Sequence, residues 1–590
     1  MEMILRKVSA FLRSITTMVW KQLPLFVLLF AFSTVPALFG GKSDVAYVRT
    51  VVSFLIPQSI LLCLLICWLA SLRRWIWWVI FIASNLIFLI ELGCFFCQHT
   101  RFGSAIAVLF LQTNLSESRE FISFAIIPVL KALLSSALII ATALCWAHYW
   151  RKGLADKLYR RLRLDNAWIE TGIGCILALS VIYSPLRLRQ CMEAYKYDTG
   201  RLGPMHDTCA AVTYYYAFVD SVFNPKIQDL DILIKTNSEV SVQRSDSVPE
   251  LSIVYVIGES YGRSRSSLFG YPFETNPRMK KEMGDSALFI FDNVIAPFSQ
   301  TNQVYRQLLS TSDILSDTPF VESPLLPAVL KKGNYFVAYY DNQSVLNNST
   351  FDFSSTYFLC DKDIQQQSID VTNDCKQQHD IPFYYANLPD TDKSLSLTIY
   401  HLMGQHVACK ARYPADSTYF SANDYINLGY YTEKQAQAVA EYDNATRYND
   451  QFLAKVIDGL RDKIAIMVYT PDHGDEIYDY RDHIGRELNF PIESIRLLFE
   501  VPVMIWVSDK YKQLYPEKVE MLRANVHKAI YNCDLPHTIL DAAGIETESF
   551  RPYLSLFRAG NGRTDRRIIQ NGYEYDANRQ QIDSFKMRYE

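Results

Sequence analysis

The stretch Tyr469-Thr470-Pro471-Asp472-His473-Gly474-Asp475-Glu476 decides the fold of this chain and points to its chemistry. It follows an apolar run, residues 464–468, that has the length and composition of a buried strand. Where this strand ends, a carboxylate stands beside an imidazole, and a glycine follows them. A short motif of this kind is an ordinary turn in many proteins, so its meaning depends on the rest of the chain.

A second predicted strand ends in a similar way. The apolar run 251–257 leads into Gly258-Glu259-Ser260. Ligands of open α/β sheets bind beyond the carboxyl ends of the strands, so we expect Glu259, Asp472 and His473 to meet at one edge of a sheet. Carboxylate and imidazole groups are suitable ligands for a catalytic zinc ion, and the sequence therefore predicts a Zn²⁺ site there.

The carboxyl-terminal part of the chain has the pattern of an α/β domain. Strand-like runs cover residues 252–257, 287–291, 335–339, 396–400, 464–469 and 501–507. Helical patterns lie between them, for example over residues 434–460. This alternation predicts a mostly parallel sheet with helices on both faces.

The amino-terminal third has a different composition. With 590 residues, the chain is too long for one ordinary domain. Its first third is dominated by apolar runs of about the 20 residues that cross a bilayer. We predict five membrane-spanning helices, near residues 23–39, 51–72, 75–96, 122–148 and 168–183.

Basic residues between these runs predict the orientation. They precede the first run and occupy the segments between the second and third and between the fourth and fifth, as Arg6, Lys7, Arg13, Arg73, Arg74, Arg151, Lys152, Lys157, Arg160, Arg161 and Arg163. The positive-inside rule then makes the amino terminus cytoplasmic and puts the chain after about residue 185 on the far side of the membrane.

These patterns divide the chain into four predicted segments. Residues 1–185 are the membrane domain, 186–248 connecting helices near the membrane surface, 249–550 the exported catalytic domain, and 551–590 a polar carboxyl-terminal tail.

Several ordered motifs together resemble a known family. They are Val-Ile-Gly-Glu-Ser (256–260), Gly-Tyr-Pro-Phe-Glu-Thr-Asn-Pro (270–277), Phe-Asp-Asn-Val (291–294), His-Leu-Met-Gly-Gln-His (401–406), Tyr-Asp-Asn (442–444), Asp-His-Gly-Asp-Glu (472–476) and Val-Pro-Val-Met-Ile-Trp (501–506). With the five spans, they resemble the bacterial phosphoethanolamine transferases that modify lipopolysaccharide, the core-modifying branch being nearest. The resemblance implies a five-span α-helical membrane domain and an α/β exported domain of the alkaline phosphatase/sulfatase type.

The resemblance also implies roles for particular residues. Glu259, Asp472 and His473 match zinc ligands, and Thr301 matches the nucleophile that completes the zinc shell. Ser299 is a weaker candidate for the nucleophile.

Two further groups match positions that contact the substrates. His406 and His483 match histidines at the transferred phosphate or the leaving group. Thr113, Asn114 and Glu117 match a loop that contacts lipid between the third and fourth spans.

The activity that the resemblance implies is a two-step transfer. Zinc favours the alkoxide of Thr301, which takes phosphoethanolamine from phosphatidylethanolamine, and a lipopolysaccharide or lipid A acceptor then receives it. The implied location is the bacterial inner membrane, multi-pass, with the catalytic domain in the periplasm. Its partners are membrane lipids, and no nucleic acid is expected.

Other functions stay open or are disfavoured. A phosphoglycerol transferase acting on an envelope glycan shares the five-span plan and the threonine–metal chemistry. A non-catalytic membrane sensor would have a broken metal shell, whereas all four proposed ligands are present. A sulfatase would need Cys or Ser in a Cys/Ser-x-Pro-x-Arg sequence, and the segment 298–303 reads Phe-Ser-Gln-Thr-Asn-Gln. A transporter is disfavoured by the few charges within the spans.

Overall fold

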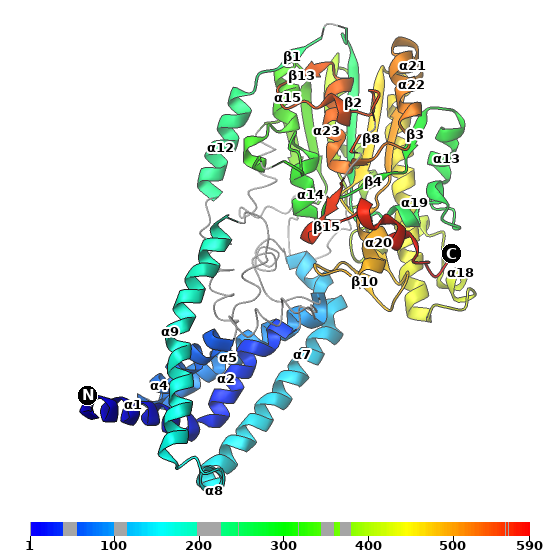
Figure 1. The fold of residues 1–590 in the computed structure, drawn as a ribbon. Helices are drawn as coiled ribbons and strands as arrows, with labels where there is room; N and C mark the ends of the chain where they lie inside the picture. Colours follow the sequence, from blue (N-terminus) through cyan, green and yellow to red (C-terminus); the bar gives the residue numbers. More distant parts are fainter. Residues whose placement is uncertain are drawn as a thin grey trace. The chain divides into compact units, whose positions relative to one another are not determined.

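The computed structural model describes most of the chain as two compact units (Figure 1). The described residues are 2–38, 56–72, 74–98, 115–197, 226–245, 247–316, 318–343, 359–365, 379–560, 562–563 and 566–589. One unit comprises residues 1–224 with 487–489, and the other comprises residues 225–486 with 490–590.

The larger unit is built on a seven-stranded sheet in the order β3-β11-β8-β2-β7-β5-β6. The strands are β3 (Leu288–Phe291), β11 (Val503–Val507), β8 (Ala465–Pro471), β2 (Leu251–Gly258), β7 (Leu395–His401), β5 (Phe336–Asp341) and β6 (Lys362–Gln365). Strand β11 is antiparallel to both neighbours, and the five strands from β8 to β6 are mutually parallel. The strand predictions made from the sequence are confirmed.

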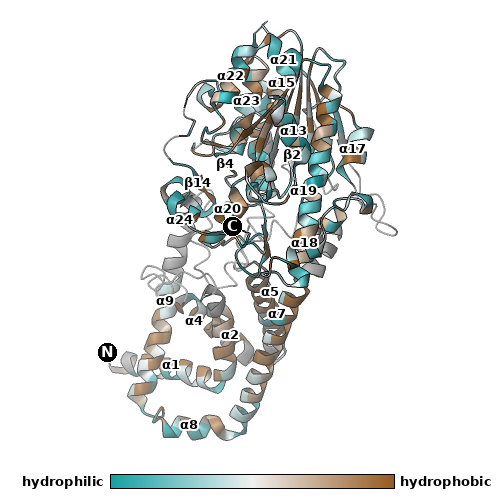
Figure 2. Ribbon diagram, turned by 90° about the vertical axis from the view of Figure 1, so that its right-hand side faces the viewer, coloured by the Kyte–Doolittle hydropathy of each residue, from teal (hydrophilic) through white to brown (hydrophobic). Residues whose placement is uncertain are grey.

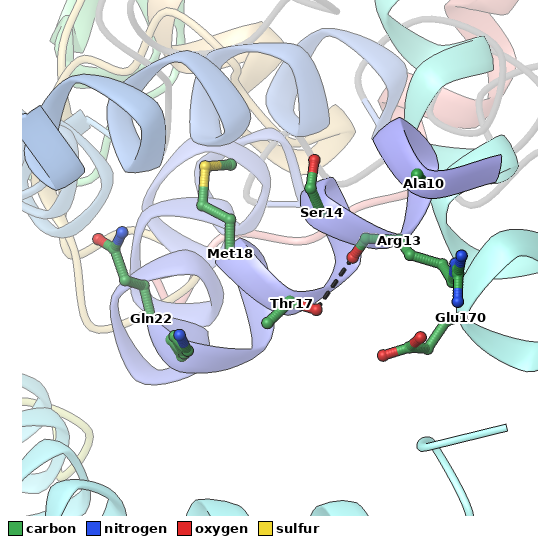
Figure 3. A pocket seen from close by; sticks show the side chains of 8 residues that line it. Ala10, Arg13, Ser14, Thr17, Met18, Gln22 and Glu170 are labelled. Atoms are coloured by element: carbon green, nitrogen blue, oxygen red, sulfur yellow. Dashed lines mark hydrogen bonds between the residues drawn. The ribbon is translucent and has the colours of Figure 1, made fainter. Parts of the chain in front are cut away.

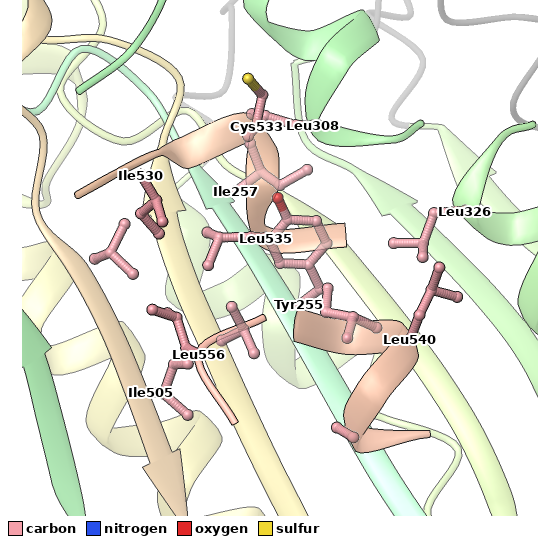
Figure 4. Close-up of a cluster of buried hydrophobic side chains, with 14 of the residues drawn as sticks. Tyr255, Ile257, Leu308, Leu326, Ile505, Ile530, Cys533, Leu535, Leu540 and Leu556 are labelled. Atoms are coloured by element: carbon pink, nitrogen blue, oxygen red, sulfur yellow. The ribbon is translucent and has the colours of Figure 1, made fainter. Parts of the chain in front are cut away.

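Helices cover both faces of this sheet, because alternate side chains of each strand point to opposite faces. On one face, Tyr255 and Ile257 pack with helices α14 (Thr301–Leu308), α15 (Leu326–Lys332) and α23 (Leu535–Ala542). Figure 4 shows part of this cluster. On the other face, Val254 and Val256 pack with α13 (Pro277–Gly284), α17 (Asp380–Ala386) and α19 (Glu433–Leu460). A sheet covered on both faces accounts for the continuously apolar strands.

The order of the strands places the carboxyl ends of β2, β7 and β8 beside one another. Strand β2 lies between β7 and β8 and is parallel to both, although they come later in the chain. Strands that follow β2 in the chain therefore lie on both of its sides. Such a switch point leaves a crevice at the carboxyl edge, which is where ligands bind in open α/β sheets.

Residues 551–590, predicted as a polar tail, contribute to the core of this unit. Leu556, Phe557, Ile569, Tyr575 and Ile582 are buried in the cluster that contains Tyr255. Short elements hold them, including β14 (Ile568–Ile569) paired with β15 (Tyr573–Glu574). The prediction that this segment is a tail is therefore corrected, since it is part of the packed unit. The apolar residues that pack here are widely spaced in a polar sequence, so the sequence pattern did not predict their burial.

In the smaller unit, five helices cover the five predicted spans. They are α2 (Leu23–Leu38), α4 (Ile56–Leu72), α5 (Arg74–Gln98), α7 (Leu115–Tyr149) and α9 (Ala167–Tyr197), preceded by α1 (Glu2–Lys21). Hydrophobic residues, coloured brown in Figure 2, occupy much of α2, α5 and α7. On α7, Leu134 and Leu138 are 71% and 69% exposed, as expected of side chains that contact lipid.

Length and apolarity support fewer spans than the sequence predicted. In the described part of the chain, the helix Ile126–Arg161 is long and apolar enough to cross a membrane. Two helices, Arg6–Lys21 and Leu23–Phe32, are bent by 81° at the short break between them, and they add a second span if they are taken together as one span. The apolar helices Gln58–Leu69, Phe81–Phe96 and Ala167–Val181 are shorter. The number of five spans therefore stays a prediction.

Candidate metal centre

Glu259 follows the last residue of β2, at the switch point of the sheet. Its side chain is fully buried. The hydroxyl of Ser260 donates to Oε1 of Glu259 at 2.7 Å, and Nε2 of Gln343 donates to Oε2 at 3.1 Å. These two bonds fix the carboxylate. Ser260 has a φ of 55°, a left-handed conformation that costs a non-glycine residue energy and is found at functional sites.

Asp472 and His473 follow the end of β8, directly beside Glu259. Both side chains are fully buried. Oδ1 of Asp472 accepts from the backbone N–H groups of Ser260, at 3.0 Å, and of His473, at 2.8 Å. Among the described residues, Oδ2 of Asp472 receives no hydrogen bond. A buried carboxylate oxygen without a donor is suited to a cation.

The hydrogen bond of the His473 ring defines which nitrogen is available to a metal. Nδ1 lies 2.8 Å from the carbonyl oxygen of Gly474, which can only accept, so Nδ1 carries a proton. Nε2 then presents its lone pair to the cluster. A histidine that donates its other N–H to a backbone carbonyl is the usual arrangement of metal-binding histidines.

Gly474 is required by the close packing of this turn. A Cβ at this position would lie 1.9 Å from the carbonyl oxygen of Leu497 and 2.9 Å from Cα of Gly262. Any side chain would therefore push the turn away from its neighbours and displace His473. Steric exclusion of a side chain therefore explains why glycine follows Asp472 and His473.

Thr301 approaches the same point from a third element. It is the first residue of α14 and is half-buried. Its Oγ1 lies 3.2 Å from Oε2 of Glu259 and 3.3 Å from Nε2 of His473. The N-cap residue of the helix is Gln300, so Thr301 is not itself the cap.

The spacing of these atoms fits a tetrahedral zinc ion. Ligands 2.0–2.2 Å from such an ion lie roughly 3.3 Å from one another. Nε2 of His473 lies 3.0 Å from Oδ2 of Asp472 and 3.6 Å from Oε1 of Glu259. Glu259, Asp472 and His473 form the metal-capable cluster found among the described residues, and Thr301 supplies a fourth oxygen beside it.

Ser299 is held away from a catalytic role. It is fully buried, and both its backbone N–H and its hydroxyl lie 3.1 Å from Oε1 of Gln570. Because its hydroxyl donates to Gln570, Ser299 is a structural residue here. Thr301 is the hydroxyl that reaches the cluster.

Arg486 is a site residue that the sequence did not predict. Its guanidinium group contacts Nε2 of His473 and lies 3.9 Å from Oε1 of Glu259. It is delivered by the hairpin of β9 (Glu476–Ile477) and β10 (Ile484–Gly485). Gly485, with a φ of 99°, allows the turn into Arg486. A Gly-Arg pair soon after a metal motif is the signal that could have found it.

His406 lies in the loop that follows β7. Its backbone N–H donates to Met403, and the side chain of Arg412 donates to the carbonyl oxygen of His406 at 3.2 Å. Burial lowers the pKa of His406 to about 3, against the effect of the Glu259 carboxylate, so the ring is neutral at physiological pH. In the described structure, its Nδ1 is buried without a hydrogen-bond partner. A neutral, unpartnered imidazole nitrogen beside the cluster is suited to a substrate group.

Of the remaining predicted residues, the structure describes the position of His483 and only part of the lipid-contacting loop. His483 directly precedes β10, and its carbonyl oxygen accepts from the backbone N–H of Tyr478. Thr113 and Asn114 lie outside the described residues. Glu117 lies in α7, and its side chain is not among those described.

The relatives of this chain support the assignment that its motifs suggest. Residues 252–545 match the sulfatase family. The chain is 25% identical over 502 residues to phosphoethanolamine transferase EptC of Escherichia coli, covering 81% of each protein. It is 26% identical over 432 residues to the Kdo(2)-lipid A phosphoethanolamine 7''-transferase of E. coli, covering 69% of this chain and 71% of that protein.

Solved structures agree on the fold. The zinc complex of the periplasmic domain of E. coli EptC matches with a TM-score of 0.51 and 26% identity, covering 57% of this chain and 96% of that domain. The integral membrane lipooligosaccharide phosphoethanolamine transferase A of Neisseria meningitidis matches with a TM-score of 0.55 and 17% identity, covering 93% and 98%.

Residues 252–545 therefore form a domain of the sulfatase family, and the chain is similar to phosphoethanolamine transferases over most of its length. It is an enzyme of the transferase class, and the resemblance seen in its motifs is confirmed.

Proposed function

We propose that this protein transfers phosphoethanolamine from phosphatidylethanolamine to a lipopolysaccharide or lipid A acceptor on the periplasmic side of the bacterial inner membrane. The observation that carries the proposal is the convergence of Thr301 Oγ1 with Glu259, Asp472 and His473, which places one half-buried hydroxyl beside three buried metal ligands. The names of the relatives supply the transferred group and the acceptor class.

Glu259, Thr301, Asp472 and His473 would hold the zinc ion. When bound, zinc would favour the deprotonated form of a coordinated hydroxyl and offset the negative charge of a phosphate. Ser260 and Gln343 keep Glu259 oriented toward this position. Such supporting hydrogen bonds hold metal ligands in place and tune them.

Thr301 is the proposed nucleophile. Its hydroxyl is close enough to Oε2 of Glu259, at 3.2 Å, to lose its proton there. Oγ1 then attacks the phosphorus of phosphatidylethanolamine, a P–O bond forms to Oγ1, and the P–O bond to diacylglycerol breaks. His483 gives a proton to the departing diacylglycerol oxygen. The product is phosphoethanolamine esterified to Thr301.

Arg486 and His406 bind the phosphoryl group in this account. A phosphoryl transfer spreads negative charge over the non-bridging oxygens, which a planar guanidinium can bind with two N–H groups. Arg486 already lies beside His473 and Glu259, so its guanidinium is within reach of a phosphate on Thr301. His406, neutral in the enzyme, accepts or donates a hydrogen bond without adding charge.

The second step releases the group to the acceptor. A hydroxyl oxygen of the acceptor attacks the phosphorus and gives its proton to His483, which lost one in the first step. The bond to Oγ1 breaks, and the proton held by Glu259 restores the Thr301 hydroxyl. When a phosphate oxygen attacks instead, His483 regains its proton from water. Dividing the transfer between two steps gives ping-pong kinetics. Both substrates are lipids, so membrane attachment keeps the site near their headgroups.

Mass spectrometry of host lipopolysaccharide, with and without the gene, tests the proposal. We expect a phosphoethanolamine substituent that disappears when the gene is deleted and returns with the wild-type gene but not with a Thr301→Ala copy. An unchanged lipopolysaccharide would contradict the proposed acceptor. A phosphoglycerol substituent would show that the alternative transferase activity is the correct one.

A further inference from the structure

A second polar site lies in the smaller unit, between α1 and α9. It is a cavity of about 550 Å³, lined by Ala10, Arg13, Ser14, Thr17, Met18, Lys21, Gln22 and Glu170 (Figure 3). All lining residues except Glu170 come from one face of α1 and its junction with α2, because their spacing repeats every three to four residues. None of them belongs to the metal centre.

Close packing of α1 on α9 fixes the walls of this cavity. Thr16 Oγ1 donates to the carbonyl oxygen of Glu170 at 2.8 Å, and the hydroxyls of Ser9 and Thr171 lie 3.1 Å apart. A Cβ on Gly174 would lie 2.3 Å from the carbonyl oxygen of Leu12, so this glycine permits the helices to touch. These contacts therefore fix the position of Glu170 relative to the polar face of α1.

The cavity carries groups of both charges. Arg13 and Lys21 are cations, and Glu170 is an anion that accepts a hydrogen bond from Tyr159. Figure 3 shows the side chains of Arg13 and Glu170 next to each other at one end and Gln22 at the other. In the described part of the chain, Arg13 and Glu170 form no ion pair with each other, so both remain available to a ligand.

The hydroxyl groups of the cavity are set to accept hydrogen bonds. Ser14 donates to the carbonyl oxygen of Phe11 at 2.7 Å, and Thr17 donates to that of Arg13 at 3.0 Å. Their donor capacity is used, and the oxygen lone pairs remain. A ligand group that donates several hydrogen bonds, such as a primary ammonium, can use these oxygens together with Glu170.

The surroundings place the cavity at the level of lipid headgroups. The indole of Trp20 donates to the carbonyl oxygen of Ala155, and that of Trp150 donates to Trp20. These bonds tie the end of α1 to the basic turn before α8 (Ala155–Arg161), which the positive-inside rule puts at the cytoplasmic surface. Phe11, on α1, is 63% exposed, as expected of a helix that lies in the membrane interface.

We propose that this cavity binds the headgroup of a zwitterionic aminophospholipid of the inner leaflet. The phosphodiester binds Arg13 and Lys21, and the primary ammonium binds Glu170 and the oxygen of Thr17. An anionic headgroup would place a second negative charge beside Glu170, and a quaternary ammonium could donate no hydrogen bond. The site is separate from the metal centre, and the proposal does not depend on the transferase function.

Native mass spectrometry of the full-length protein tests the site. The protein is prepared with Thr301→Ala, so that bound phosphatidylethanolamine is not consumed. Phosphatidylethanolamine, phosphatidylcholine and phosphatidylglycerol with the same acyl chains are titrated separately. We expect the aminophospholipid to bind at least tenfold more tightly through this site, since hydrogen bonds to charged groups have about that effect.

The variants Glu170→Gln, Arg13→Gln and Lys21→Gln identify the site, and Lys7→Gln, on an exposed position of the same helix, is the control. We expect each of the first three to lose one tightly bound phosphatidylethanolamine while the control keeps it. Folding is checked by gel filtration. Equal lipid binding by all four variants would overturn the proposal, as would equal binding of phosphatidylglycerol by the parent protein.

Discussion

The hydroxyl oxygen of Thr301 lies 3.3 Å from Nε2 of His473, although the two residues are 172 positions apart. One begins helix α14, and the other follows strand β8. Nε2 presents a lone pair because Nδ1 donates to Gly474. The Thr301 hydroxyl can donate to this lone pair, and the two buried carboxylates beside them supply the negative charge that attracts a cation.

The first prediction is metal binding. Metal analysis of the purified full-length protein should find about one zinc per chain, as expected of a single four-ligand site. Asp472→Asn and His473→Ala should lose it, because each removes a ligand atom. Ser299→Ala is the matched control, since Ser299 bonds Gln570 and should leave the zinc in place. Normal zinc content in both ligand variants would show that the metal site is wrongly assigned.

The second prediction concerns Arg486. Arg486→Gln should lower kcat/KM by about 10²- to 10³-fold, the usual effect of removing one donor that stabilises transition-state charge. Arg486→Lys should recover part of the loss, because it keeps the charge and loses the two-pronged geometry. Zinc content should not change in either variant. Wild-type kinetics of Arg486→Gln would remove Arg486 from the mechanism.

The third prediction separates the two histidines by pH. A general acid must be protonated, so activity falls as pH rises through its pKa. Because burial lowers the pKa of His406 to about 3, it is already neutral at the pH of the assay and cannot supply this limb. His406→Gln should therefore lower the rate without moving the alkaline limb of the pH–rate profile, whereas His483→Gln should abolish that limb. A shifted alkaline limb in His406→Gln would reverse the assignment.

The fourth prediction concerns orientation in the membrane. Reporter fusions at Leu164 and at Val248 should give cytoplasmic and extracytoplasmic signals respectively, because the basic residues before Leu164 favour the cytoplasm. The opposite pattern would contradict a periplasmic transfer, since the acceptor lies outside the inner membrane.

Much of the site could be predicted from the sequence, because its ligands follow apolar strands. The runs before Glu259 and Asp472 are β2 and β8, and parallel neighbours necessarily bring their carboxyl ends together. Thr301 required the resemblance to a family, since a threonine at a helix start has no pattern of its own. The position of α14 relative to the sheet, which brings Thr301 to the cluster, depends on tertiary packing and cannot be predicted from the local sequence.

Other features depend on packing that leaves little trace in the sequence. Arg486 arrives through a short hairpin, and Gln343 follows β5, two strands away from β2. Neither position is marked by periodicity. The core residues of 551–590 are separated by polar ones, so composition indicated a tail. The number of spans depends on how much of each apolar helix lies in lipid, which hydropathy alone does not determine.

Detection of the covalent intermediate tests whether Thr301 is the nucleophile. The full-length enzyme is incubated with phosphatidylethanolamine and no acceptor, quenched in acid and digested, and fragment spectra locate any modification. We expect phosphoethanolamine on residue 301 of the wild-type enzyme and of Thr301→Ser. Thr301→Ala, shown by gel filtration to be folded, should carry no adduct and should not turn over. Full turnover by Thr301→Ala, with no adduct on any residue, would contradict the account.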